Sequence, residues 1–167
     1  MITPMLLSRF AVPLLFYSPG ILGTEGRRFD TVASHVDIAP SVLGLLGVRA
    51  PHQCWGRNLF ALEESDPGFA VIKPSGGENE VAIIEGDHIL IKHPGETSQL
   101  FRFSLKHPPE VSADLYHDEP ERAARLERKL SAYVQSAILL LRQRSLGVPP
   151  GDVVRATASG SALSTGE

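Results

Sequence analysis

Apolar stretches and their spacing divide the chain into predictable elements. Val12 to Tyr17 is continuously apolar and is followed by Pro19-Gly20, a pattern typical of a strand buried on both faces of a mainly parallel sheet. Residues 21–30 are polar and interrupted by glycines, which indicates a loop. The pattern therefore predicts a buried strand and then a loop in the first 30 residues.

A short helix is predicted from about Ile38 to Leu46. Its apolar residues recur at helical spacing and fall on one face: Ile38, Val42, Leu45 and Leu46. Asp37 is a suitable N-cap, and Pro40 lies in the first turn, where its missing N–H is harmless. Gly47 is placed to end the helix.

The middle of the chain predicts antiparallel strands. Glu80 to Glu85 and His88 to His93 flank Gly86-Asp87, the arrangement of a tight hairpin with glycine at its first central position. Gln99 to Leu105 alternates in the way of a half-buried third strand, and Phe69 to Ile72 predicts a further short one. We therefore expect a small antiparallel sheet.

The clearest helical pattern follows this sheet. Asp118 is the expected cap, Pro120 lies in the first turn, and Glu121 stands three residues after the cap, as in a capping box. One apolar stripe recurs at helical spacing from Ala123 to Leu141, and Gly147 marks the end. Such a helix laid across one face of the sheet makes a stable two-layer arrangement.

Composition and charge narrow the classes of partner. The 167 residues are 43% hydrophobic and 21% charged, an ordinary globular composition with a modest core. The net charge is -3 and there is no run of Lys or Arg, so we expect no nucleic-acid partner. Cys54 is the only cysteine, so no intramolecular disulfide forms, and we interpret it as a small buried hydrophobe.

The apolar start of the chain does not read as a targeting or membrane segment. Pro4, Arg9 and Pro13 interrupt the stretch from Met1 to Tyr17, and no small-residue cleavage site follows it. The stretch is also too short and too broken to cross a bilayer as a helix. We expect no direct membrane insertion by this chain.

Four segments, in this order, resemble sulfatases of the alkaline phosphatase superfamily. The sharpest is Val36 to Gly47, where Asp, Pro and a final Leu-Gly are spaced as in that family after a Val-Pro-Leu strand. Gly56 to Leu59 stands where relatives have Gly-x-Ser-Leu, with Asn in place of Ser. Ile84 to Lys92 resembles the family's late hairpin, and Leu115 to Pro120 the segment before its last helix. Within that superfamily, the residues from Ser34 to Gly47 resemble the lipoteichoic acid synthase-like phosphoglycerol transferases slightly more than the sulfate ester hydrolases.

The resemblance implies an α/β fold: the C-terminal fragment of a sulfatase-like (alkaline phosphatase-like) fold, with a small antiparallel sheet covered by a long C-terminal helix. It also implies metal-dependent chemistry on sulfate or phosphate (phosphoglycerol) esters, with Mn, Mg or Ca in the full-length family. The family's nucleophile and its Asp-His-Gly ligand motif precede the Val-Pro-Leu strand. This chain contains neither, so we expect no catalytic residue, no metal ligand and no activity of the chain alone.

The same resemblance implies an organisation and a partner. We expect residues 1–63 to form the end of the central domain, 64–146 the C-terminal subdomain with its terminal helix, and 147–167 a disordered tail. The expected partner is a missing upstream catalytic portion, or a second copy. The alternative is a stand-alone structural or binding remnant, or a subunit of a split enzyme. The family is typically extracytoplasmic and often membrane-anchored, whereas the sequence of this chain indicates no location.

His35 is the one candidate for a residue near substrate. It precedes Asp37 at a predicted strand-to-helix junction, where open α/β sheets present residues to ligands, although a packing role is the alternative. The six histidines show no HxH, HxxxH or HExxH spacing of a metal site. Asp87-His88 invites a metal interpretation, but neighbouring residues of a strand point to opposite faces, so we interpret it as a turn.

Overall fold

The computed structural model describes residues 7, 10–48, 54–73, 79–104 and 110–143. The chain forms two compact units. The first comprises residues 1–34 and 63–132, and the second comprises residues 35–62 and 133–167. The predicted disordered tail, residues 147–167, lies outside the described residues.

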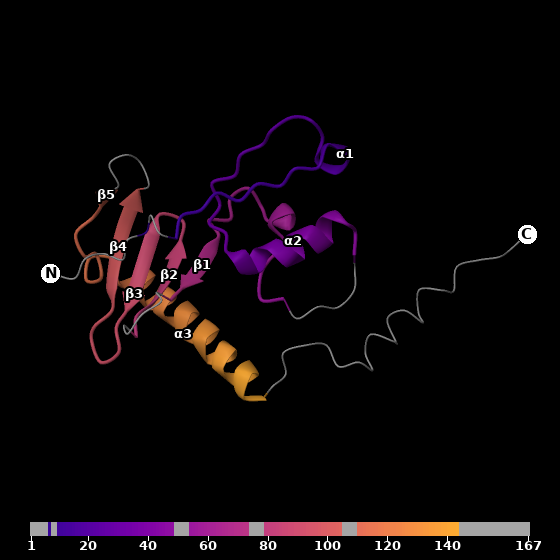
Figure 1. The fold of residues 1–167 in the computed structure, drawn as a ribbon. Coiled ribbons are helices and arrows are strands. Elements are labelled where there is room, and N and C mark those ends of the chain that lie inside the picture. Colours follow the sequence, from indigo (N-terminus) through magenta and orange to yellow (C-terminus); the bar gives the residue numbers. More distant parts are fainter. Residues whose placement is uncertain (1–6, 8–9, 49–53, 74–78, 105–109, 144–167) are drawn as a thin grey trace, which may run out of the picture. The chain divides into compact units, whose positions relative to one another are not determined.

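The first unit contains the predicted antiparallel sheet (Figure 1). Its strands pair in chain order: β1 (Phe69–Ile72), β2 (Val81–Glu85), β3 (His88–Lys92), β4 (Gln99–Ser104) and β5 (Glu110–Val111). The β2–β3 hairpin is confirmed, with Glu85 opposite His88. Gly86 has a φ of 58°, the left-handed conformation that a tight hairpin turn requires. The two-residue strand β5 was not predicted.

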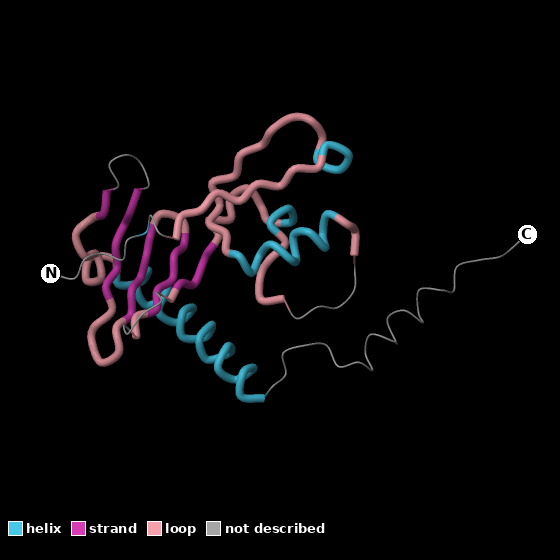
Figure 2. Tube along the Cα trace, in the orientation of Figure 1, coloured by secondary structure: helices cyan, strands magenta, loops and turns pink. Residues whose placement is uncertain are grey.

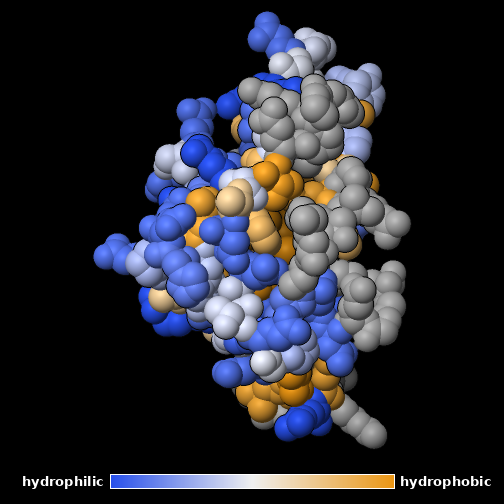
Figure 3. All heavy atoms as spheres, turned by 90° about the vertical axis from the view of Figure 1, so that its left-hand side faces the viewer, coloured by the Kyte–Doolittle hydropathy of each residue, from blue (hydrophilic) through white to orange (hydrophobic). Residues whose placement is uncertain are grey.

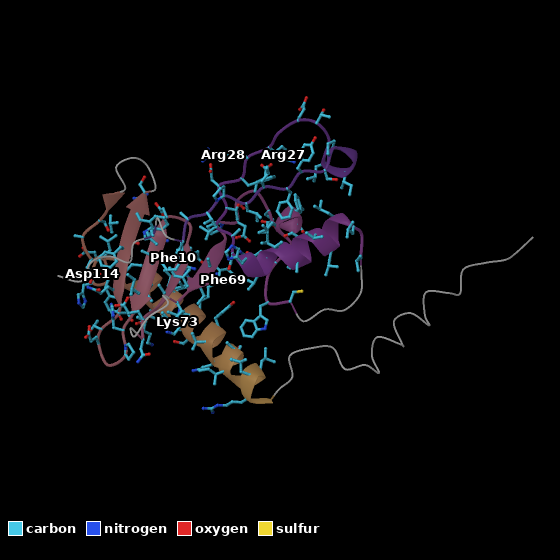
Figure 4. All side chains as sticks on the ribbon, in the orientation of Figure 1. Phe10, Arg27, Arg28, Phe69, Lys73 and Asp114 are labelled. Atoms are coloured by element: carbon cyan, nitrogen blue, oxygen red, sulfur yellow. The ribbon has the colours of Figure 1, made fainter. Side chains whose placement is uncertain are left out.

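Residues after β5 complete the edge of β4. The amide of Leu100 donates to the Asp114 carboxylate at 3.0 Å, and its carbonyl accepts from the amide of Leu115 at 2.7 Å. The amide of Arg102 donates to the Ser112 hydroxyl at 2.9 Å. Asp114 is labelled beside the sheet in Figure 4. These bonds satisfy backbone groups that an open sheet edge would leave unpaired.

Helix α3 (Pro120–Gln143) covers one face of the sheet with its first half (Figure 1). Ile83, Leu90 and Leu100 are fully buried on this face, and so is Leu126 of the helix. The carboxylate of Glu85 fixes the arrangement, because it binds Arg125 and Lys129 of α3 at 2.5 and 2.7 Å. The predicted helix over a small antiparallel sheet is therefore confirmed, although Ile138 and Leu141, at the end of its predicted apolar stripe, are 45% and 63% exposed.

The opposite face of the sheet is also buried. Its cluster consists of alternate residues of β2, β3 and β4: Ala82, Ile84, Ile89, Ile91 and Phe101. Leu7 and Val32, from the first part of the chain, pack against this cluster. Burial on both sides explains why β2 and β3 are continuous apolar runs instead of alternating ones.

The start of α3 differs from its prediction by one residue. The helix begins at Pro120, and the amide of Ala123 donates to the carbonyl of Glu119 at 3.0 Å. Glu119 therefore occupies the position before the helix, and Asp118 lies in the preceding turn. Asp118 therefore does not occupy the N-cap position that the predicted capping box with Glu121 requires. Proline has no amide hydrogen, so it fits best at the first helical position itself.

The second unit contains α2 (Ile38–Leu45), which follows a 3₁₀ turn, η2 (His35–Asp37), and a further 3₁₀ turn, η3 (Leu59–Ala61). Gly47 ends α2 as predicted, with a φ of 68°. The amides of Gly47 and Val48 donate to the carbonyls of Gly44 and Leu43, the pair of bonds of a Schellman motif.

The buried face of α2 is not the predicted one. Pro40 and Ser41 are buried, whereas Val42 and Leu46 of the expected apolar stripe are 39% and 63% exposed. The hydrogen bonds of Ser41 to Asp37 and Leu59 hold this side of the helix inside the unit. The apolar spacing alone therefore predicted the wrong buried face. The side chains of Val42 and Leu46 remain part of the surface of this unit.

Val12 to Tyr17 forms no strand, contrary to the prediction. The segment is drawn as loop in Figure 2 and leads into the single turn α1 (Pro19–Leu22). Leu15 and Tyr17 are each 85% exposed. An apolar run becomes a buried strand only where neighbouring strands and covering layers exist, and the described residues place no strand beside it.

Candidate functional site

His35, the predicted substrate-proximal residue, is exposed and is the first residue of the 3₁₀ turn η2. Asp37 is the last residue of the same turn, and helix α2 begins at the next residue, Ile38. Within the described part of the chain, no group of three or more His, Cys, Asp or Glu side chains is arranged to hold a metal ion. His35 thus stands at the surface of the second unit, without a metal-ligand set around it in that part.

Asp37 does not cap α2, contrary to the prediction. Its backbone has helical angles and its carboxylate makes no capping bond. Instead, one carboxylate oxygen accepts from the backbone amide of Arg57 at 2.6 Å, and the other accepts from the Arg57 guanidinium at 3.1 Å. Asp37 is 2% exposed, so this is a buried ion pair held by two charge-assisted hydrogen bonds.

Ser41 joins the same two segments. Its hydroxyl donates to the carbonyl of Asp37 at 2.6 Å, one helical turn earlier, and accepts from the amide of Leu59 at 3.0 Å. The side chain is fully buried and its hydroxyl both donates and accepts. We call Asp37, Ser41 and Arg57 the polar junction of the second unit.

Gly56 and Gly44 let the backbone segments approach closely at the polar junction. A side chain on Gly56 would overlap the backbone of Val36, and one on Gly44 would overlap the amide group of Asn58. Backbone atoms at Val36 cannot move aside as a flexible side chain can. The segments Val36–Gly47 and Gly56–Leu59, which carry the resemblance to sulfatases, therefore lie against each other in the folded chain.

Trp55 and Tyr133 pack beside each other in the second unit. Their ring centroids lie 5.0 Å apart in an edge-to-face arrangement. Burial raises the pKa of Tyr133, and the charge of Asp37 raises it further. The neighbouring Cys54 is half-buried.

A second polar cluster lies in the first unit, around His88. The Nδ1 atom of this histidine lies 2.6 Å from the Asp87 carboxylate, and its Nε2 atom lies 3.5 Å from the Glu119 carboxylate. The expectation that Asp87 and His88 point apart is wrong, because Asp87 lies in the turn, outside the alternation of the strand. We call Asp87, His88 and Glu119 the His88 cluster.

The charges in the His88 cluster are balanced by arginines. Burial raises the pKa of Asp87, but the hydrogen bond from Arg102 and the charges of His88 and Arg102 outweigh it, so the pKa lies below its usual value. The hydrogen bond from Arg122 lowers the pKa of Glu119. The two carboxylates face different nitrogens of the imidazole, so they do not converge on one point where a metal ion would bind.

Among the described residues, His93 and His117 do not join either cluster. The Nδ1 atom of His93 lies 3.0 Å from the Glu80 carboxylate, and exposed His117 packs its ring against Tyr116. His52 and His107 lie outside the described residues. The sequence interpretation missed Ser41 and Arg57, although a polar residue four positions after Asp37 on an otherwise apolar helix was an available signal.

Comparison with protein-family models and with curated proteins found no match for this chain. No helix among residues 10–48, 54–73, 79–104 and 110–143 is both long and apolar enough to cross a membrane.

Proposed function

We propose that this chain is the C-terminal part of a sulfatase-like enzyme that acts on sulfate or phosphate (phosphoglycerol) esters, and that its role in that enzyme is structural. The observation that supports this role is the polar junction. The motif residues Asp37, Gly56 and Arg57 serve to hold two backbone segments together. In this proposal, the family's motif residues in this chain are needed for packing of the backbone segments. Their presence is compatible with a chain that carries no catalytic group.

The metal implied by the resemblance does not fit the residues described here. Asp37, the most buried carboxylate of the described residues, is engaged by a guanidinium, and a metal ion would have to displace that guanidinium. Glu85 and Asp87 are likewise paired with cationic side chains. In this proposal, the nucleophile and the carboxylate and histidine ligands for Mn, Mg or Ca come from residues outside these 167.

The experiment that tests the proposal restores the catalytic portion. The DNA preceding the Met1 codon should contain a continuous or frameshifted reading frame that encodes an Asp-His-Gly motif. The chain joined to that portion should hydrolyse an aryl sulfate or a phosphodiester only when Mn, Mg or Ca is added, and the chain alone should not. An intergenic region with its own ribosome-binding site would contradict the proposal. So would metal-dependent turnover by the chain alone that disappears in Asp87→Ala or His35→Ala.

An exposed apolar surface supports the second candidate function, a stand-alone or split-protein binding subunit. Val12, Leu15 and Tyr17 are 60%, 85% and 85% exposed in a segment without charged residues. Apolar atoms are also visible among polar ones on the face drawn in Figure 3. Contiguous exposed apolar residues mark contact surfaces. The occupant in this reading is the catalytic portion or a second copy of the chain.

A further inference from the structure

We propose that protonation of His88 fastens the start of α3 to the β2–β3 turn, so that the docking of this end of the helix depends on pH. His88 is the first residue of β3 and is 5% exposed. Its ring lies between Asp87, which belongs to the turn, and Glu119, which immediately precedes α3. One side chain thus contacts two elements that are distant in the sequence.

The chemistry of the ring makes this contact dependent on one proton. A neutral imidazole has a single N–H, so one of its two nitrogens would turn a lone pair toward a carboxylate. An imidazolium has an N–H on both nitrogens and a positive charge between two negative ones. Neither nitrogen of His88 makes a well-aligned hydrogen bond in the structure. Attraction to both carboxylates at once is therefore strongest in the protonated form, which alone carries an N–H on each nitrogen and a positive charge.

The surrounding cations leave one carboxylate oxygen, Oδ1 of Asp87, to the imidazolium alone. Arg102 of β4 is paired with His88 across the sheet and binds the Oδ2 atom of Asp87 at 2.6 Å, while the Nδ1 atom of His88 faces Oδ1. Arg122 of α3 binds the Oε2 atom of Glu119 at 2.6 Å, and this same oxygen lies 3.5 Å from the Nε2 atom of His88, so the imidazolium shares it with Arg122. Glu85 of β2, opposite His88, is occupied by Arg125 and Lys129. The oxygen nearest the ring, Oδ1 of Asp87, is thus on the side that Arg102 does not use.

The direction of the pH effect follows from these groups. The pKa values of Asp87 and Glu119 are lowered, so both carboxylates stay ionised at weakly acidic pH and can attract a protonated ring. At such a pH the imidazolium joins the turn to the helix. As the pH rises, the proton is lost and the first turn of α3 opens more readily.

The amide of Ala123 reports on this first turn, because it donates to the carbonyl of Glu119. The test is amide hydrogen exchange of the full chain at several values between about pH 5.5 and 8, corrected for the intrinsic exchange rate. If opening of the first turn of α3 releases one proton, the protection factor changes by up to about tenfold per pH unit. We expect the protection factor of Ala123 to fall by about tenfold over this range.

Variants separate His88 from the other titrating groups. His88→Gln should abolish the fall in Ala123 protection, and His117→Gln, at an exposed histidine just before the helix, should leave it unchanged. Glu119→Gln removes one of the two carboxylates and should also reduce the change of Ala123 protection with pH. This second variant tests the proposal if His88→Gln does not fold. Constant Ala123 protection in the unaltered chain, or an undiminished fall in His88→Gln or Glu119→Gln, would overturn the proposal.

Discussion

Arg57 binds Asp37 twice, through its backbone amide at 2.6 Å and through its guanidinium at 3.1 Å, although the two residues are twenty positions apart. The double contact fixes both the path of the backbone at Arg57 and the position of its side chain. Because Asp37 is buried and Arg57 is only 21% exposed, loss of either partner removes charge-assisted hydrogen bonds from a site with little access to water. The pair is therefore a structural requirement of the second unit.

The first prediction concerns this pair. Asp37→Ala should lower the free energy of unfolding by about 3 kcal/mol, because the guanidinium and the backbone amide of Arg57 both lose their acceptor. Urea unfolding followed by circular dichroism, which reports on the helices and strands of both units, measures the change. Asp30→Ala is the control, since Asp30 pairs with Arg28 at the surface.

The control variant should change the unfolding free energy by less than about 1 kcal/mol, as expected of an exposed pair. Equal effects of Asp30→Ala and Asp37→Ala would show that the buried pair contributes nothing beyond a surface one. Double substitution at Asp37 and Arg57 should be less destabilising than the sum of the single substitutions, because the second removes the orphaned charge.

The second prediction concerns the close approach at Gly56. Gly56→Ala should lower the free energy of unfolding by about 2 kcal/mol or more, because the added methyl group meets the backbone of Val36. Gly26→Ala is the matched control, since nothing lies within 4 Å of the position of its added carbon. Thermal unfolding of the two variants compares them directly. A stable Gly56→Ala variant would mean that the two segments do not pack as closely as described.

The antiparallel sheet and the helix over it could be predicted because local signals agree with the tertiary structure there. Gly86 supplies the turn, and the buried apolar residues of α3 from Ala123 to Leu130 have the helical period. Strand β5 could not be predicted, because two residues carry no periodic pattern and their pairing depends on β4. The strand expected at Val12–Tyr17 failed because burial on both faces depends on neighbours, not on the run itself.

The polar junction illustrates a different limit of sequence reasoning. Asp37 before a helix has the same local appearance whether its carboxylate caps the helix or binds a distant arginine. The choice depends on where Arg57 lies in three dimensions, which no spacing rule encodes. The same holds for Asp87 and His88, whose side chains meet because one residue belongs to the turn and the other to the strand.

The third prediction concerns Glu85. Burial raises the pKa of its carboxyl, but hydrogen bonds and charges from Arg125 and Lys129 bring it below the usual value of 4.5. A lowered folded-state pKa contributes stability above the unfolded-state value, and this contribution is lost as the pH falls through the folded-state value. Glu85→Gln should therefore destabilise the chain at neutral pH by about 1–2 kcal/mol, since the two cations remain partly exposed.

The difference in stability between the unaltered chain and Glu85→Gln should shrink steadily as the pH falls below about 4.5. Chemical unfolding at a series of acidic pH values measures it. Glu64→Gln, at an exposed pair with Arg27, should show little difference at any pH. A Glu85→Gln difference that stays constant with pH would show that the ionised carboxylate is not the stabilising form.

The last prediction concerns the exposed segment Val12–Tyr17. Leu15 and Tyr17 are each 85% exposed, and no charged residue from Phe10 to Gly23 opposes association of this apolar surface. We expect the isolated chain to self-associate as its concentration rises, and Leu15→Glu to reduce that association by introducing charge and removing apolar area. Sedimentation equilibrium measures both. Thr24→Glu adds the same charge at an exposed polar position and should leave association unchanged. A chain that stays monomeric at every concentration, with Val12–Tyr17 amides as protected from hydrogen exchange as those of Leu126–Leu130, would show that this segment needs no partner.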